Sequence, residues 1–322
     1  MMIDAVKSEF SFANLIQSLF PNSSYNPEQK SKVTVAVAAA DHLVTLKSVK
    51  QAADAGIADF LLFGDAESIR GIAEAGKIDI RNFKIVHCID QKDAADKAVS
   101  AASNGTAHVL MKGGVHTSVF TSAFLNKTKG LVPKGGLISH TALFKIPGYK
   151  KPFLLTDAAI NIKQDCEKKK KILLNAVQVS RALGILRPSV ACVCPVETVN
   201  PKIVSTVDAD ILVRNQNTTH MFGDAVIEGP MGLDAAFSSE AARVKKINGE
   251  VPGNPDILLM PSLDAGNVLY KAFSIQQGSL TAGIIAGLRV PVVLTSRSDS
   301  ITTRFLSLYM ALAVSAGMSE RV

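Results

Sequence analysis

The chain has 322 residues, with 35 Lys and Arg against 28 Asp and Glu, which gives a net charge of +7 and a pI of about 9.2. Hydrophobic residues make up 47% and charged residues 20%, values that exclude an intrinsically disordered chain. Aromatic residues are sparse, at 6% with no Trp, which argues against a surface that stacks the bases of nucleic acid. The modest positive charge suits small anionic ligands, and the length predicts two domains.

The cysteines and the apolar segments indicate a cytoplasmic protein with neither a metal site nor a membrane partner. Four cysteines in so long a chain do not form a disulfide framework, and their spacing lacks the paired ligands of a zinc site. Charged residues interrupt the first ten positions, where a signal peptide would be apolar. The apolar run 280–295 contains Arg289 and Pro291, and 305–317 is too short to span a bilayer.

The first part of the chain alternates short apolar segments with amphipathic ones. The predicted strands, each with the helix that follows it, are 33–40 with 42–55, 59–65 with 66–75, 84–90 with 91–103, and 108–114 with 116–126. This repetition is typical of right-handed βαβ crossovers and predicts a parallel sheet.

A passage rich in Gly, Lys and Pro at 126–136 ends this pattern and predicts a domain boundary. Beyond it, the sequence predicts strands within 153–159, 189–194, 224–230, 256–266 and 291–296, and helices over about 165–184 and 299–317. We therefore expect an α/β fold with two mostly parallel sheets, helices on both faces and an active-site cleft between two domains. The first domain would contain 1–137 plus 290–322, and the second 138–289.

In open α/β sheets, ligands bind beyond the carboxyl ends of the strands, so the turns that follow the predicted strands are the candidate sites. After 108–114, Gly113 and Gly114 would let an anion approach the backbone, while Lys112 and His116 would supply charge or a donor. A plain glycine turn with a helix cap at 117–118 would have the same composition.

Two later turns are weaker candidates. Gly229 and Pro230 form a sharp turn between a strand and a helix. Further on, Asp264, Asn267 and Lys271 share one face of a predicted helix, although solvent-exposed helix faces show the same pattern. Glycine early in that helix, at position 266, costs up to about 1 kcal/mol relative to Ala and predicts that another group approaches the backbone there.

The turn after 291–296 carries the clearest functional signal. Arg297 would lie at the positive end of the last helix, where the helix dipole repels a cation unless an anion binds between them. Its forked donors, the hydroxyl of Ser296 and the helix amides together suit a phosphate. Either Ser296 or Asp299 could cap the helix.

These turns resemble those of the phosphate acetyl/butyryl transferases. The matching segments are GPMGLDAA at 229–236, SLDAGNVLYK at 262–271 and LTSRSDS at 294–300, together with the early segments VAAADH and LLFGD. They occur in the family's order and cover nearly the whole chain. The match is closer to the butyryl branch, whose pattern has an Asp soon after the Ser-Arg pair.

The resemblance implies a reversible reaction of acyl-CoA and orthophosphate to acyl phosphate and CoA, with these molecules as substrates and no cofactor or metal in the chemical step. It implies the fold of the isocitrate/isopropylmalate dehydrogenases and a homodimer or larger homo-oligomer. Arg297 would bind phosphate and stabilise the developing charge, and Ser296 would donate a hydrogen bond to the acyl group. Asp264, Asn267 and Lys271 would shape the cleft.

Two departures from the family concern residue roles. The acetyl branch has, seven residues after the Ser, an Asp that acts as the base on the CoA thiol. This chain has Thr303 there, and Asp299 is the candidate to replace that base. That branch also has an Arg in the helix after the Lys-Gly-Gly turn, and segment 113–126 has none, so Lys112 or His116 would compensate. Two alternatives stay open, a metal- and NAD-dependent hydroxyacid dehydrogenase of the same fold group and a non-catalytic protein that binds anions or nucleic acid.

Overall fold

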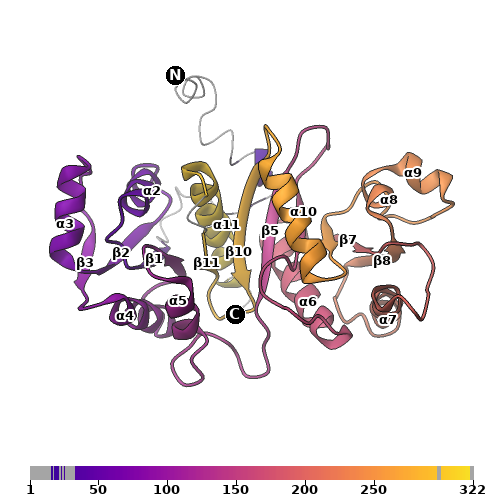
Figure 1. Cartoon of the computed structure of the whole chain (residues 1–322), viewed down its shortest axis with the longest axis horizontal. Coiled ribbons are helices and arrows are strands. Elements are labelled where there is room, and N and C mark those ends of the chain that lie inside the picture. Colours follow the sequence, from indigo (N-terminus) through magenta and orange to yellow (C-terminus); the bar gives the residue numbers. More distant parts are fainter. Residues whose placement is uncertain are drawn as a thin grey trace.

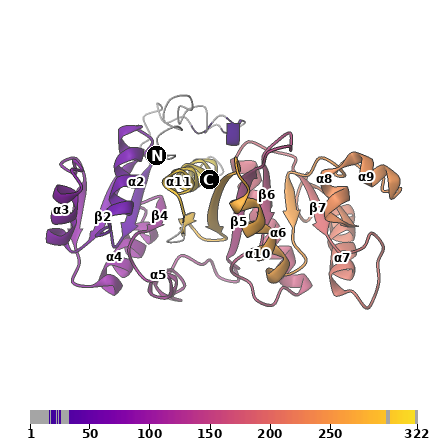
Figure 2. The ribbon, with the colours of Figure 1, turned by 45° about the horizontal axis from the view of Figure 1, so that its top comes forward.

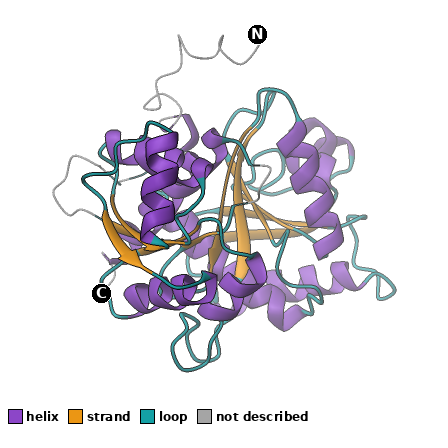
Figure 3. Cartoon of the chain, turned by 60° about the vertical axis from the view of Figure 1, so that its left-hand side comes forward, coloured by secondary structure: helices purple, strands orange, loops and turns teal. Residues whose placement is uncertain are grey.

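A single sheet of eleven strands passes through the whole molecule, with helices on both of its faces (Figures 1 and 3). This computed structural model describes residues 16, 18–21, 23, 25, 33–295 and 299–319. The strand order is β3-β2-β1-β4-β11-β10-β5-β6-β9-β7-β8. The α/β class and the mostly parallel pairing are as predicted, but the expectation of two separate sheets is wrong, because β10 and β11 join the halves into one sheet.

The first half of the sheet matches the predicted alternation of strands and helices. Its strands are β1 (Thr34–Ala38), β2 (Asp59–Gly64), β3 (Lys84–His87) and β4 (Val109–Lys112), and its helices are α2 (Leu43–Asp54), α3 (Ala66–Ala75), α4 (Gln91–Ser103) and α5 (Thr117–Phe124). All four strands are parallel, and β1 and β4 are almost wholly buried. Their continuous apolar runs suit a parallel sheet that is covered on both faces.

The second half has the same α/β character with less regular spacing. Its strands are β5 (Ser139–Lys145), β6 (Phe153–Thr156), β7 (Ser189–Val193), β8 (Val226–Met231), β9 (Ile257–Leu259) and β10 (Leu280–Ala286). Its helices are α6 (Cys166–Ala182), α7 (Val204–Thr219), α8 (Leu233–Phe237), α9 (Ser239–Val244) and α10 (Leu263–Ile275). The sequence analysis predicted a helix after the turn at 229–230, where α8 lies, but it did not predict β5, β10, α7 or α9.

The junction reverses the direction of the sheet. The last strand, β11 (Val292–Val293), pairs in parallel with β4 and meets β10 through one antiparallel residue pair, Ile285 with Val292. Both β10 and β6 are antiparallel to β5. The carboxyl ends of β1, β4 and β11 therefore lie at one edge of the sheet, and those of β6, β7, β8 and β9 lie at the opposite edge.

The last helix, α11 (Ile301–Ser319), lies near the middle of the molecule (Figure 2). It has the predicted length but begins and ends two residues later, and its segment Ile301–Met318 is long and apolar enough to cross a membrane by length and composition. However, 72% of that segment is buried inside the protein, packed with α2 and α6 on one face of the sheet. Helices α4 and α5 cover the other face of the first half, and α8 and α10 cover that face of the second.

Candidate active site

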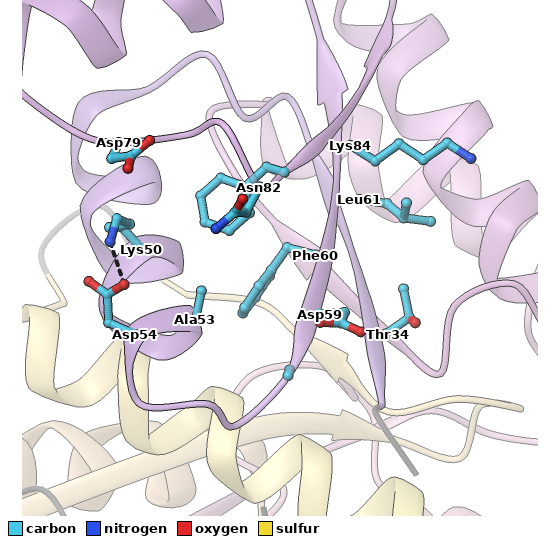
Figure 4. A pocket seen from close by; sticks show the side chains of 12 residues that line it. Thr34, Lys50, Ala53, Asp54, Asp59, Phe60, Leu61, Asp79, Asn82 and Lys84 are labelled. Carbon is cyan, nitrogen blue, oxygen red and sulfur yellow. Dashed lines mark hydrogen bonds and ion pairs between the residues drawn. The ribbon is translucent and has the colours of Figure 1, made fainter. Parts of the chain in front are cut away.

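Each half of the molecule has a large cavity near the ends of its strands. One, of about 620 Å³, lies at the amino ends of β1, β2 and β3, where Thr34, Asp59 and Lys84 line it and Lys50 pairs with Asp54 (Figure 4). Ligands of α/β sheets bind at carboxyl ends, so this cavity is in the wrong place for the candidate site. The other, of about 650 Å³, opens beyond the carboxyl ends of β7 and β9.

The predicted turn after β4 lies at the carboxyl edge of the first half. We expected its glycines to let an anion approach the backbone, but their amides make hydrogen bonds within the protein. The amide of Gly113 donates to the Ala38 carbonyl (2.8 Å) and that of Gly114 to the Ala39 carbonyl (2.6 Å). These amides hold β4 to the end of β1. Lys112 is buried, at 6% exposed, and its Nζ lies 3.3 Å from the Gly113 carbonyl oxygen. The turn thus brings a buried cation to this edge.

Helix α5 begins directly after this turn without a side-chain cap. Its first flanking residue, His116, makes no capping hydrogen bond, and the His116 amide donates instead to Gln91 Oε1 of α4 (3.1 Å). The predicted cap at 117–118 is therefore absent, because Thr117 is already the first residue of the helix. Because no side chain caps them, the amides of this first turn form an open positive end of the helix dipole, which favours an anion.

The turn after β11 reaches the same edge. Ser296 and Arg297 lie outside the described residues, but both flanks of the turn are described. Buried Arg304 of α11 donates from Nη1 to Thr295 Oγ1 (2.8 Å) and from Nε to the Asp299 carbonyl (3.3 Å). One guanidinium therefore bridges the two flanks of the turn. Burial lowers the Arg304 pKa, and the Asp299 carboxylate opposes this shift.

The cap of α11 is Ser300, which is neither of the two predicted candidates and directly follows Asp299. Its Oγ accepts a hydrogen bond from the Thr303 amide (3.0 Å) and lies 3.0 Å from Thr303 Oγ1. Because Ser300 satisfies the helix end, Asp299 is not needed as a cap. Thr303, at the position where the acetyl branch has its acid, is engaged in this capping interaction.

Helix α10 carries three of the predicted site residues, and their surroundings differ. Asp264 and Lys271 are exposed, while Asn267 Nδ2 donates to the Ala158 carbonyl (2.8 Å) just beyond β6. The predicted close approach at Gly266 comes from the protein itself, since a Cβ there would lie 2.5 Å from the Asp157 carbonyl oxygen. Glycine thus allows the start of α10 to pack on the end of β6.

An aromatic group that the sequence analysis missed lies farther along α10. The Tyr270 ring meets His140 and Phe144 of β5 at 5.4 Å each between ring centroids, at interplanar angles of 75° and 69°. Burial raises the Tyr270 pKa, and so does the negative charge of Asp299. Tyr270 of the second half is therefore within electrostatic reach of the turn after β11.

His140 is a buried histidine at the junction of the two halves. Its side chain lies over β10, where a Cβ at Gly283 would come within 2.9 Å of Nε2. Its Nδ1 is buried without a hydrogen-bond partner. Burial lowers the His140 pKa, and the nearby carboxylate of Asp157 opposes this shift only in part. The imidazole is therefore neutral at neutral pH.

The remaining predicted turn lies at the opposite edge of the sheet. Gly229 packs against Cys192 of β7, and the adjacent Glu228 accepts the amides of Glu250 (3.0 Å) and Val251 (3.2 Å). Both Gly229 and Pro230 lie within β8, so the predicted sharp turn at these two residues is wrong: the strand continues to Met231, and α8 begins at Leu233. These contacts hold the segment within its own half of the molecule.

No group of three or more His, Cys, Asp or Glu residues that could hold a metal occurs within the described part of the chain.

The sequence analysis found both turns at the first edge and missed Arg304, Tyr270 and His140. Arg304 resembles any charged residue in a helix, and only its burial and its two acceptors reveal its position. Tyr270 belongs to the segment 262–271 that had been singled out, so attention to its aromatic member would have found it. For His140, the missed strand β5 removed the only signal.

Comparisons with known proteins relate most of the chain to one group. The model of the family described as phosphate acetyl/butaryl transferase matches residues 87–312. A phosphate butyryltransferase from Clostridium acetobutylicum is 41% identical over 287 residues, which cover 89% of this chain and 95% of that protein.

Two solved structures share the fold. A branched-chain phosphotransacylase from Enterococcus faecalis has a TM-score of 0.78 at 34% identity, covering 88% of this chain and 99% of that one. A 4-hydroxythreonine-4-phosphate dehydrogenase from Burkholderia phymatum has a TM-score of 0.50 at 15% identity, covering 89% of this chain and 98% of that one, and this likeness concerns the fold alone.

Proposed function

The chain belongs to the phosphate acetyl/butaryl transferase family and is a phosphate acyltransferase, and from this premise we propose that it transfers a butyryl or similar short acyl group between CoA and orthophosphate. The observation that carries the proposal is the family match over residues 87–312, which spans both turns at the first carboxyl edge. The 41% identity to a phosphate butyryltransferase supports the choice of a butyryl-sized group.

The reaction needs no covalent intermediate with the protein. In a ternary complex, a phosphate oxygen attacks the thioester carbonyl carbon, a tetrahedral oxyanion forms, the carbon–sulfur bond breaks and CoA leaves as the thiolate. In the reverse direction, the CoA thiol loses its proton and its sulfur attacks the acyl phosphate. The protein's task is to hold two anionic reactants in line and to stabilise the oxyanion.

We assign the phosphate to the first carboxyl edge. Arg297 would bind it with forked hydrogen bonds, Ser296 would donate to the acyl group, and Asp299 would accept the thiol proton. Buried Lys112 and the uncapped first turn of α5 at His116 support an anion there. Gly113 and Gly114 would contribute by holding the turn in place, because their amides bond to the end of β1.

The second half would form the other wall of a cleft between two domains, 1–137 with 290–322 and 138–289. The single residue pair between β10 and β11 supports a boundary at that point. Asp264, Asn267 and Lys271, with Gly229 and Pro230, would shape the part of this wall that meets CoA. Membership of the family supports a homodimer or larger assembly with no resident cofactor. The four free cysteines support a reducing compartment, the cytoplasm.

The proposal is tested by phosphate-dependent release of CoA thiol from butyryl-CoA, followed with a thiol reagent. We expect activity that requires phosphate and falls by about 100-fold or more in Arg297→Ala. The matched control is Arg243→Ala, since Arg243 pairs with Glu240 on the exposed surface of the second half and should be dispensable. Absence of phosphate-dependent release across acetyl- to octanoyl-CoA would overturn the proposal. Absorbance at 340 nm with NAD and hydroxyacids would reveal the dehydrogenase alternative.

A further inference from the structure

Tyr270 is held at the junction of the two halves by two rings from one strand. His140 and Phe144 lie four residues apart on β5 and therefore on the same face of the sheet. Each meets the Tyr270 ring edge to face, at 5.4 Å between centroids. Such pairs have a preferred edge-to-face geometry, so together they restrict the orientation of the Tyr270 ring.

The position of Tyr270 along α10 brings it toward the first carboxyl edge. Helix α10 connects β9 to β10, which run in the same direction, so it runs opposite to both strands. Since β11 is antiparallel to β10, α10 advances toward the edge where β11 ends. The seven helical steps from Leu263 to Tyr270 span about 10 Å in that direction.

The chemical state of Tyr270 suits a hydrogen-bond donor. Its side chain is half-buried, so a ligand can reach it. Burial and the charge of Asp299 both raise the pKa of the phenol, which keeps its proton in place at neutral pH. A protonated phenol next to a turn that handles acyl and phosphate groups can donate to an oxyanion but not act as a base.

We propose that Tyr270 is a further catalytic residue, whose hydroxyl donates a hydrogen bond to the acyl carbonyl oxygen as the tetrahedral oxyanion forms, and that His140 is the residue that positions it. The proposal rests on the proposed acyl transfer. Since His140 Nδ1 has no partner, His140 acts through the shape of its ring rather than through a hydrogen bond. Gly283 makes room for that ring over β10.

The decisive variant is Tyr270→Phe, which removes the hydroxyl and keeps the ring between His140 and Phe144. We expect kcat to fall by about 100-fold, with the KM for butyryl-CoA and for phosphate within about threefold of wild type, because the bond strengthens only in the transition state. The matched control is Tyr149→Phe. Tyr149 belongs to the same aromatic cluster and also has a raised pKa from burial, but it contacts Phe153 and Phe237 instead. Its loss should leave kcat unchanged.

Variants of His140 separate positioning from chemistry. His140→Phe should retain kcat within about threefold, because the edge contact survives, whereas His140→Ala should lose about tenfold in kcat as the Tyr270 ring becomes free to rotate. Thermal unfolding of each variant identifies a loss of fold, and if His140→Ala does not fold, the two tyrosine variants still decide the question.

Several outcomes would overturn the inference. Tyr270→Phe with kcat within threefold of wild type would do so, as would an increase in KM with kcat unchanged, since that pattern indicates a binding contact alone. An equal loss in Tyr149→Phe would show a general effect on the aromatic cluster. Failure of the proposed function is distinguishable, because the wild-type enzyme would then show no phosphate-dependent thiol release.

Discussion

The two carboxyl edges of the sheet occupy equivalent positions in the topology and differ in their charges. At the first edge, buried Lys112 and Arg304 lie at the ends of β4 and β11. At the second, Lys245 lines the cavity beyond β7 and β9 but pairs with both Glu197 (2.5 Å) and Asp234 (2.8 Å). The two carboxylates beside Lys245 partly neutralise its charge, so a cation at a carboxyl edge does not by its position alone make an anion site.

The largest effect should follow from removing the guanidinium beneath the turn after β11. Arg304→Ala would free Thr295 and the Asp299 carbonyl from their common donor, and a displacement of about 1 Å at a reacting group can cost about 100-fold in rate. We expect that loss in kcat for phosphate-dependent thiol release. Arg304→Lys keeps the charge but not the fork and should recover only part of it. Wild-type kcat in Arg304→Ala would show that the turn holds itself in place.

Lys112 should affect binding more than chemistry. In Lys112→Met the side chain keeps its length and loses its charge, so the KM for phosphate should rise by about tenfold with a smaller change in kcat. Initial rates at several phosphate concentrations would measure this. If the KM for phosphate stayed the same, the positive charge of this turn would serve folding and not the substrate.

The junction between the edges should show a dependence of stability on pH. The folded-state pKa of His140 lies below its unfolded value of about 6.5, so unfolded chains bind the proton first as pH falls. The free energy of unfolding is thus highest above pH 6.5 and decreases below it, by up to about 1.4 kcal/mol per pH unit from this group. Urea unfolding at pH 7.5, 6.5 and 5.5 should show a smaller decrease in His140→Phe. Identical decreases in both proteins would refute the assignment.

The smallest effect should come from the second edge. Lys245→Met removes a partly exposed cation whose two ion pairs are screened by water, so kcat and both KM values should stay within about twofold of wild type. A tenfold rise in the KM for CoA or butyryl-CoA would instead show that Lys245 itself binds CoA despite its two ion pairs, and would remove the distinction between the charges of the two edges.

The elements that the sequence predicted well are those whose signal is local. In the first half, each strand is followed by one helix of 8 to 13 residues, and the bounds of α3 and α4 are as predicted. Strand β5 escaped because it follows a loop rich in Gly and Pro and is buried on both faces, which leaves no alternation of polar and apolar residues. Strand β10 was noticed only as part of an apolar run.

The candidate site divides in the same way. A residue at the carboxyl end of a strand, such as Lys112, can be found from the sequence, because the end of an apolar strand is recognisable in one dimension. Arg304, Tyr270 and His140 were missed, because their importance depends on acceptors, rings and strands that are distant along the chain.

By itself, the sequence determined the α/β class, the parallel pairing of the first half and the family, since apolar periodicity and short motifs are local properties of the chain. Tertiary structure alone decided that the two halves form one sheet and that its direction reverses at β10. It also brought Tyr270 of one half within electrostatic reach of Asp299 of the other. The physical reason is that strand pairing and side-chain packing depend on contacts between distant segments, which exist only once the chain has folded.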